Sequence, residues 1–331
     1  MKKSFVIIAA ALAAMVSCQK NSQVTQPQPK EGIPMTLTVS FDGADSKVAF
    51  AQDGSVLKGS WEATESISVV TLDGSGAFAN IVNIDNFTST GAAGRKSATF
   101  TGTFTGGESP AFVYVLYPAL EEYSTNKYRT PDWSGAGNYV LSDLNLSGGS
   151  DSYLDSAFLP TTQASDEDLA HFNNYCVMTG VADISDIKAG TLTATLSHQL
   201  CVLKFNLTFD DSLKGKSLDC VSIGSYDSSD NVLNYFPRGG WEYANLIAVP
   251  ILANGSSYLG ANWINCSFAV PASGTATVYL PLLPPDDFAA GDYWDCIVTI
   301  NGEQRPSIKK TFTSATSFDR GKMYTINLAV N

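Results

Sequence analysis

The sequence has few of the residues on which most enzymatic chemistry depends. Only two histidines occur among its 331 residues, His171 and His198, so a two-histidine zinc-protease motif is absent, and a Ser-His-Asp triad would need one of these two. No G-x-S-x-G, P-loop or G-x-G-x-x-G sequence appears, which leaves nucleophile elbows and phosphate-binding loops without support. We therefore expect no catalytic residue, no cofactor and no metal site, and we expect His198 to be a hydrogen-bonded core residue.

Charge of either sign is also scarce, and positive charge is scarcest. Lysine and arginine together number 20 against 32 acidic residues, which gives a net charge of −12. The sequence contains no cluster of lysine and arginine that could displace counterions from the phosphates of a nucleic acid, so a nucleic-acid partner is excluded. Charged residues make up 16% of the chain, below the roughly 25% of ordinary domains. Ser, Thr, Gly, Val and aromatic residues fill the gap, and this mixture favours an all-β fold.

The only long apolar run is at the N-terminus, where Lys2 and Lys3 precede residues 5–16. It is too short for a permanent membrane helix and is typical of a secretory signal. The run ends in Met-Val-Ser-Cys, which resembles a bacterial lipobox. That resemblance implies a signal peptide over residues 1–17, cleavage between Ser17 and Cys18, and acylation of Cys18 with palmitate-type chains. We therefore expect attachment to the cell outer membrane, since several acyl chains make a stable anchor.

The mature chain then divides into a tether and two predicted domains. Residues 18–34 are polar and contain three prolines, which predicts a disordered tether. About 300 residues remain, more than one core usually serves, so we predict an N-terminal β-sandwich domain at 35–190 and a C-terminal one at 191–331. Met35, Leu37, Val39 and Phe41 alternate with polar residues and predict a half-buried first strand.

The boundary between the two predicted domains rests on the stretch 191–209, where the alternation of apolar residues changes phase. Even-numbered positions from Leu192 to Val202 are apolar except for His198, and odd-numbered positions are apolar from Cys201 to Phe209. Because strand side chains alternate with period two, such a change requires a bulge or a strand that leaves one sheet for another. We expect burial of both faces between Leu200 and Leu203.

Five cysteines remain after Cys18, an odd number for an exported chain. None is in C-x-x-C spacing, so we expect buried thiols rather than a metal site, with the pairing left open. They are Cys176, Cys201, Cys220, Cys266 and Cys296.

Several segments together resemble the fimbrillin-like pilins, lipoprotein precursors that form type V pili on Gram-negative cells. They are MTLTVSF at 35–41, WEATESISVV at 61–70, ATFTGTF at 98–104, FVYVLYPA at 112–119, SHQLCVLKF at 197–205, TVYLPLLPP at 277–285 and GKMYTINLAV at 321–330. The resemblance implies two transthyretin-like β-sandwich domains in tandem. It also implies a non-enzymatic, structural or adhesive subunit of a cell-surface pilus, with other pilin subunits as partners.

The resemblance further implies assembly by β-strand exchange. An exported protease would release the first strand, Met35, Leu37, Val39 and Phe41 included, and a strand from a neighbour would replace it. The first arginine is Arg95, so Lys47, directly after the strand, is the candidate processing site. The strand at 324–330 is followed by Asn331 alone, so we expect a tip or accessory subunit, or an anchor, rather than a shaft subunit.

An alternative interpretation is an outer-membrane glycan-binding lipoprotein. It would share the lipobox, the tether and the β-sandwiches. Its candidate ligand-binding aromatics are Tyr128, Trp133 and Trp241, whose rings could stack on a sugar of a host or other glycan. Each of these aromatic residues could instead pack in a core or against a side chain on a neighbouring strand.

Overall fold

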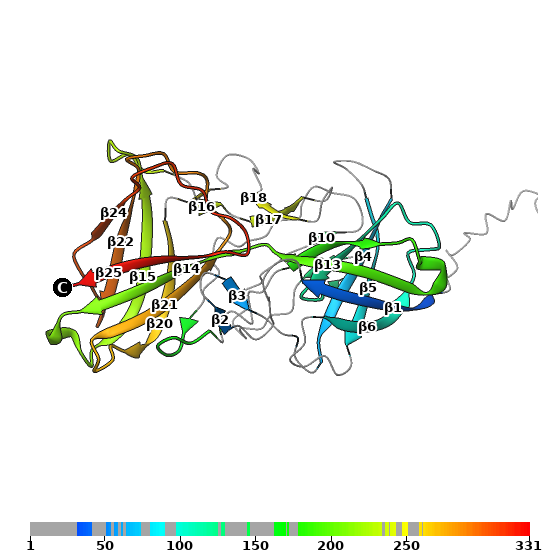
Figure 1. Cartoon of the computed structure of the whole chain (residues 1–331), viewed down its shortest axis with the longest axis horizontal. Coiled ribbons are helices and arrows are strands. Elements are labelled where there is room, and N and C mark those ends of the chain that lie inside the picture. The colour runs from blue at the N-terminus through cyan, green and yellow to red at the C-terminus, as the bar shows by residue number, and fades with distance from the viewer. Residues whose placement is uncertain are drawn as a thin grey trace, which may run out of the picture. The chain divides into compact units, whose positions relative to one another are not determined.

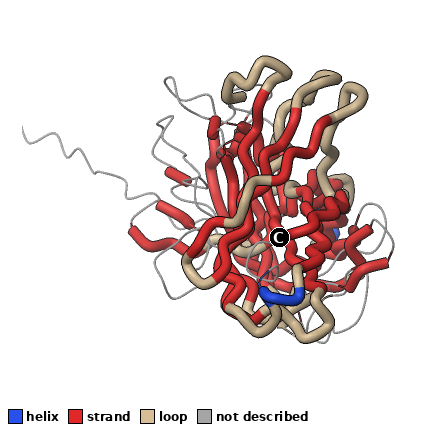
Figure 2. The backbone as a smooth tube through the Cα atoms, turned by 90° about the vertical axis from the view of Figure 1, so that its left-hand side faces the viewer, coloured by secondary structure: helices blue, strands red, loops and turns tan. Residues whose placement is uncertain are grey.

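In the computed structural model of the chain, the described residues begin at Gly32. The described residues are 32–41, 51–53, 56–58, 61, 64–73, 80–89, 97–124, 127–129, 144–145, 162–169, 171, 178–233, 236–237, 239–242, 247–250, 258–259 and 261–331. Strands dominate them, and the helical segments whose bounds are described are two short 3-10 turns, η3 (Ile187–Ala189) and η4 (Asp211–Leu213) (Figure 2). The predicted all-β class is confirmed.

Seven strands of the first half form a closed barrel in the order β1-β13-β12-β7-β4-β5-β6 (Figure 1). Their bounds are β1 (Ile33–Phe41), β4 (Ser66–Asp73), β5 (Asn80–Ser89), β6 (Ala98–Phe104), β7 (Phe112–Tyr117), β12 (Met178–Asp183) and β13 (Thr191–His198). Where the sequence predicts a sandwich of two layers, one ring is observed, because the ends of β5 and β6 pair at Thr88↔Thr101 and Ser89↔Phe100.

The barrel encloses one apolar cluster. It is centred on Trp61, which is 1% exposed and meets the rings of Phe100 and Tyr117 edge-on at 5.1 and 5.5 Å. All seven barrel strands contribute buried side chains to the cluster, β5 through Phe87. The alternating apolar residues that predicted strands in the sequence therefore supply its interior.

The second half contains two further sheets. One has the order β11-β20-β15-β22-β23, with β24 also paired to β22, and the other has the order β21-β14-β25. Their bounds are β11 (Thr162–Gln163), β14 (Cys201–Phe209), β15 (Ser217–Tyr226), β20 (Ala261–Ala269), β21 (Thr275–Leu282), β22 (Tyr293–Ile300), β23 (Glu303–Gln304), β24 (Ile308–Thr311) and β25 (Met323–Val330). A single cluster of buried residues draws on both sheets, so they pack face to face as a sandwich.

Short strands form four small ladders outside these sheets. They are β2 (Ala51–Asp53) with β3 (Val56–Lys58), β8 (Glu121–Ser124) with β9 (Lys127–Arg129) and β10 (Leu144–Asn145), β16 (Phe236–Pro237) with β19 (Tyr258–Leu259), and β17 (Gly239–Glu242) with β18 (Ile247–Pro250). Within the described part of the chain, no helix has the length and hydropathy that crossing a bilayer requires.

The phase change predicted at 191–209 is a change of sheet. β13 ends at His198 in the barrel, and β14 begins at Cys201 in the sandwich. Even-numbered residues of β13 face the barrel cluster, and odd-numbered residues of β14 face the sandwich cluster. The strand pairing thus leaves Thr191–His198 with the first sheet, so the switch falls at residues 199–200. The division into domains at 190/191 stays a prediction.

Burial at this switch agrees with expectation except at one position. Cys201, Val202 and Leu203 are at most 3% exposed, but Leu200 is only half-buried. The backbone carbonyl of Leu200 accepts a hydrogen bond from the N–H of Gly321 at 2.8 Å. Leu200 lies between the two strands, in neither sheet, which explains why neither core covers it fully.

Candidate functional site

The candidate site is β1 together with the two strands that hold it. β1 pairs antiparallel with β6, from Ile33↔Phe104 to Val39↔Ala98, and parallel with β13, from Thr36↔Thr191 to Phe41↔Leu196. Strands distant in sequence thus flank the first strand on both sides. Figure 1 shows β1 in blue between the green β13 and the cyan β6.

A tight turn starts the parallel pairing of β1. The 3-10 turn η3 ends at Gly190, whose φ of +78° is a left-handed conformation that glycine adopts without strain. The carbonyl of Gly190 accepts a hydrogen bond from the N–H of Thr36 at 2.9 Å. A Cβ added at Gly190 would lie 3.3 Å from the carbonyl oxygen of Pro34, so this turn and β1 approach each other closely.

The central residues of the inward face of β1 are buried. Met35 is 3% exposed, and Leu37 and Val39 are 0% exposed; all three belong to the barrel cluster. Burying three such side chains is worth roughly 4 to 9 kcal/mol, at about 1.5 to 3 kcal/mol each. That is comparable with the roughly 5 to 15 kcal/mol that stabilises a whole domain. Loss of β1 would therefore leave a barrel with an apolar gap and two unpaired backbone edges.

The remaining predicted site residues are placed less fully. Phe41 ends β1, but its side chain lies outside the description, as do those of Tyr128 on β9 and Trp241 on β17. Ser17, Cys18, Lys47 and Trp133 lie outside the described residues. The lipidation, processing and ligand-binding roles given to these residues stay predictions.

His171 is buried, and His198 is half-buried at the end of β13. The Nε2 atom of His171 lies 3.0 Å from the carbonyl oxygen of Tyr279, and burial lowers the pKa of His171. Burial also lowers the pKa of His198 to about 4, and its ring Nε2 is shielded from solvent. For both His171 and His198, burial thus favours the neutral imidazole. Among the described residues, no group of three His, Cys, Asp or Glu side chains could hold a metal ion.

The described cysteines are buried or half-buried thiols, as expected. Cys201, Cys266 and Cys296 lie in the sandwich core, Cys220 is half-buried, and these four form no disulfide. Desolvation raises the pKa of Cys266 and Cys296 to about 12 and that of Cys220 to about 11, so these thiols are poor nucleophiles. Cys176 lies outside the described residues.

One contact of the acidic run at 166–168 was not foreseen. The sequence favours a solvated turn there over a calcium site. In the structure, a carboxylate oxygen of Asp166 accepts the backbone N–H of Thr277 on β21 at 2.7 Å. Bonds between side chains and backbone produce no periodic pattern, so no sequence signal could have located this contact.

Comparison with known proteins gave matches to solved structures only. No protein-family model matches the chain, and no curated protein matches it. A "putative cell adhesion protein" from Bacteroides uniformis matches with a TM-score of 0.46 at 15% identity, over 90% of this chain and 94% of that one. A tip fimbrial protein from Porphyromonas gingivalis matches with a TM-score of 0.35 at 11% identity, over 89% and 94%.

Proposed function

We propose that this chain is a structural or adhesive subunit of a cell-surface pilus, with β1 as the strand that is exchanged during assembly. The observation that carries the proposal is the enclosure of β1 between β6 and β13 with Met35, Leu37 and Val39 buried beneath it. A strand held in this way can be replaced by another extended segment with the same alternation, because backbone hydrogen bonds supply affinity and side-chain pockets supply specificity.

Release of β1 requires a cut after it and before the rest of the barrel. Lys47 follows β1 by six residues and precedes β2 at Ala51, so cleavage after Lys47 separates the strand from the barrel covalently. The cut chain would begin at Val48. The released strand then remains only by noncovalent contacts, so an incoming strand can compete with it.

A peptide-exchange experiment tests this function. The protein is cut with a lysine-specific protease, the form beginning at Val48 is isolated, and binding of a fluorescein-labelled peptide of residues 33–41 is measured. We expect saturable binding to the cut form and at least tenfold weaker binding to the intact form, in which β1 fills the site. A peptide carrying Leu37→Asp is the matched control and should not bind, because its carboxylate would be buried without a partner. Equal binding of both peptides would overturn the proposal.

The expected attachment to the outer membrane is tested separately. Metabolic labelling with an alkyne fatty acid should tag the wild-type chain and not a Cys18→Ser variant. A label that persists in the variant would contradict lipidation at Cys18.

In cells, a Lys47→Gln variant should keep β1, whereas a Lys58→Gln variant should be processed normally.

Position within the pilus is a finer proposal. We propose a tip or accessory position, with the anchor as the alternative, and N-terminal sequencing of chains extracted from pili distinguishes them. A chain that begins at Val48 supports a tip, and one that begins at lipidated Cys18 supports an anchor. A chain whose own β25 is crosslinked inside a neighbour's barrel would overturn both.

A further inference from the structure

The two edges of the small sheet β21-β14-β25 differ in whether other residues hydrogen-bond to them. The edge of β21 is covered by residues 162–169 and 171. The first of these residues form β11, which pairs in parallel with β20 of the facing sheet through Gln163↔Cys266. The side-chain amide of Gln163 donates to the carbonyl of Thr277 at 2.8 Å and accepts from the N–H of Tyr279 at 2.9 Å. One side chain thus links the edges of both sheets.

Three further groups complete this cover of β21. Asp166 accepts the N–H of Thr277 at 2.7 Å, and the N–H of Glu167 donates to the carbonyl of Thr277 at 3.3 Å. The Nε2 atom of His171 lies 3.0 Å from the carbonyl oxygen of Tyr279. All four outward backbone groups of Thr277 and Tyr279 therefore have partners, and this edge cannot accept another strand.

The edge of β25 is not covered in this way. The carbonyls of Lys322 and Val330 accept hydrogen bonds from the β14 side, at 2.9 and 3.0 Å. In a parallel pair, alternate residues direct both backbone groups to the same neighbour. The N–H and C=O groups of Thr325, Asn327 and Ala329 consequently point away from β14. Among the described residues, no hydrogen bond reaches these six groups.

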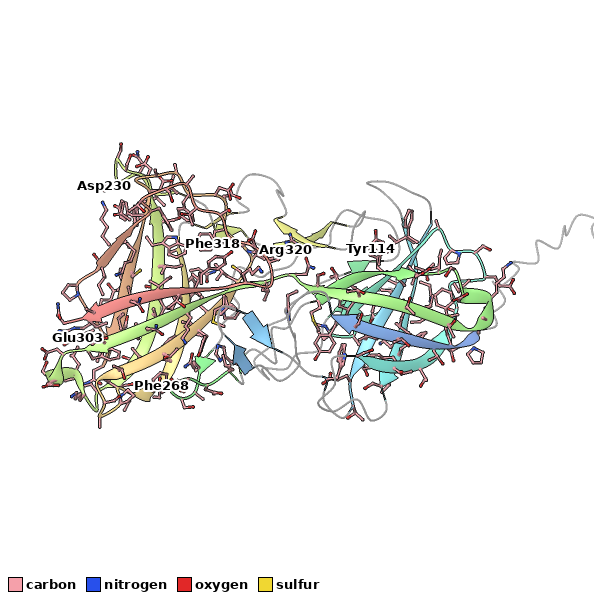
Figure 3. The ribbon with its side chains drawn as sticks, in the orientation of Figure 1. Tyr114, Asp230, Phe268, Glu303, Phe318 and Arg320 are labelled. Carbon is pink, nitrogen blue, oxygen red and sulfur yellow. The ribbon has the colours of Figure 1, made fainter. Side chains whose placement is uncertain are left out.

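An apolar seam lies beside this edge. Ile326 and Tyr324 of β25 are half-buried and pack against the sandwich cluster, as do Ile308 of β24 and Phe312 from the facing sheet. Phe318, labelled in Figure 3, is buried next to them with its ring 4.7 Å from that of Tyr324. Residues 162–169 and 171 close the opposite side of the sandwich. At this seam, described hydrogen bonds bridge only the two ends: the N–H of Asp319 donates to the hydroxyl of Tyr324 at 2.7 Å, and Nε of Arg305 donates to the carbonyl of Asn331 at 2.8 Å. Between these ends, among the described residues, no hydrogen bond crosses the seam at Ile326.

The neighbouring edge, formed by β23 and β24, carries the usual protection against strand addition. Pro306 interrupts it, and Lys309 and Lys310 follow within β24. β25, in contrast, contains neither a charged residue nor a proline from Met323 to Val330. Proline and lysine at an edge disfavour pairing with another chain, so β24 is blocked and β25 is open.

A positive charge, that of Lys310, lies beside the seam. Lys310 alternates with Lys309 and shares its face with Ile308, which packs on the core, so the half-buried Lys310 side chain lies on the seam side of β24. No carboxylate among the described residues forms an ion pair with Lys310. A carboxylate arriving in the seam would meet this cation in a partly desolvated place, where the attraction is stronger than in water.

We propose that the free edge of β25 binds an extended acidic segment of a partner protein, which adds as a strand, covers Ile326 and Tyr324 and presents a carboxylate to Lys310. This site lies on a different sheet from β1. It does not depend on strand exchange at β1, and an intact chain that keeps β1 should show it.

A peptide-binding experiment with the intact chain tests the proposal. The probe is the fluorescein-labelled peptide TVTETVTV, whose glutamate replaces one apolar residue of the seam-facing set, and TVTKTVTV is its charge control. We expect saturable binding of the glutamate peptide at least tenfold tighter than that of the lysine peptide. Lys310→Glu should reverse this preference, because the seam then carries the opposite charge.

Two further controls test the backbone contact itself. Asn327→Pro removes an outward N–H without touching the β14 ladder, so it should weaken peptide binding at least tenfold while the melting temperature stays close to that of the parent. A peptide N-methylated at the positions along one edge should also lose binding, which requires no change in the protein. Binding unaffected by N-methylation and by Asn327→Pro would overturn the proposal, as would an equilibrium dimer of the chain that Asn327→Pro dissolves.

Discussion

β1 and β25 are built alike but held differently. Each alternates apolar and polar residues, and each pairs in parallel with one of two consecutive strands, β1 with β13 and β25 with β14. β1 also has a second neighbour, β6, whereas β25 is the last strand of its sheet among those described. The number of neighbours, not the sequence pattern, therefore separates a strand that fills a core from one that offers an edge.

Burial follows the same division. Met35, Leu37 and Val39 of β1 are at most 3% exposed, while Tyr324 and Ile326 of β25 are half-exposed. A side chain at an open edge keeps one flank in contact with water, so its burial contributes less to stability. A substitution in β1 should accordingly lower the free energy of unfolding more than a matched substitution in β25. A substitution in a central strand that pairs with either of them should lower it most.

The largest effect is expected from a charge in the support of β25. Leu203→Asp places a carboxylate at a 0%-exposed position of β14, and we expect a loss on the order of 4 kcal/mol because that charge has no partner. Urea unfolding followed by circular dichroism measures it. Thr208→Asp on the exposed face of the same strand is the control and should cost little; a Leu203→Asp variant as stable as this control would show that β14 is misplaced.

A direct comparison of the two strands comes next. Leu37→Ala in β1 should destabilise by about 3 kcal/mol, because it removes buried methyl groups and leaves a cavity. Ile326→Ala in β25 should cost about 1 kcal/mol, since that side chain is already half in water. Equal losses in urea unfolding would mean that β25 is enclosed as fully as β1.

A pH dependence is expected from His198, the last residue of β13. Burial lowers its folded-state pKa to about 4, below the roughly 6.5 of an unfolded chain. The unfolded state therefore takes up a proton first, and stability is lost as the pH falls from about 6.5 to about 4. The loss between pH 7 and pH 5 should be about 2 kcal/mol.

The contribution of His198 is isolated by substitution. His198→Gln should flatten the curve of unfolding free energy against pH in that window, measured by urea unfolding at each pH. His171, whose pKa is also lowered by burial, provides the comparison through His171→Gln. A His198→Gln variant with an unchanged slope would refute the assignment.

The smallest effect is expected at the outer face of β25. The side-chain amide of Asn206 donates to that of Asn327 at 2.9 Å across β14 and β25, in an exposed position. Asn327→Ala should cost no more than about 0.5 kcal/mol, as exposed substitutions usually do. Thermal unfolding measures it, and a fall of many degrees would indicate that a segment covers this edge.

Alternation in the sequence predicted several strands of both cores, β1, β13, β14 and β25 among them, but it gave no prediction for β5. The phase change at 191–209 predicted the move between sheets. The stretch 111–117, apolar on both faces, predicts a central strand, and β7 there is paired on both sides, with β4 and β12. Alternation identifies a face of a strand, not its neighbours. It could not show that β1 runs parallel to β13, nor that β5 and β6 close the ring.

The cover of β21 was beyond sequence analysis for a different reason. Gln163, Asp166 and His171 act through side-chain bonds to the backbone of another strand, at irregular spacing. The open edge of β25 was missed because an edge is defined by which strands are not beside it. The lipidation site, the processing site and the side chains of the aromatic ligand residues lie outside what the structure describes, so the roles given to them rest on the sequence alone.

The pairing of β1 also carries a direction. A strand that takes its place must run parallel to β13 and antiparallel to β6, because reversing it would exchange the two hydrogen-bond patterns. A peptide with the residues of 33–41 in reverse order has the same composition and alternation but the opposite polarity, and should not fit. Subunits joined through this site would all be oriented the same way, so the two ends of the polymer would be chemically different.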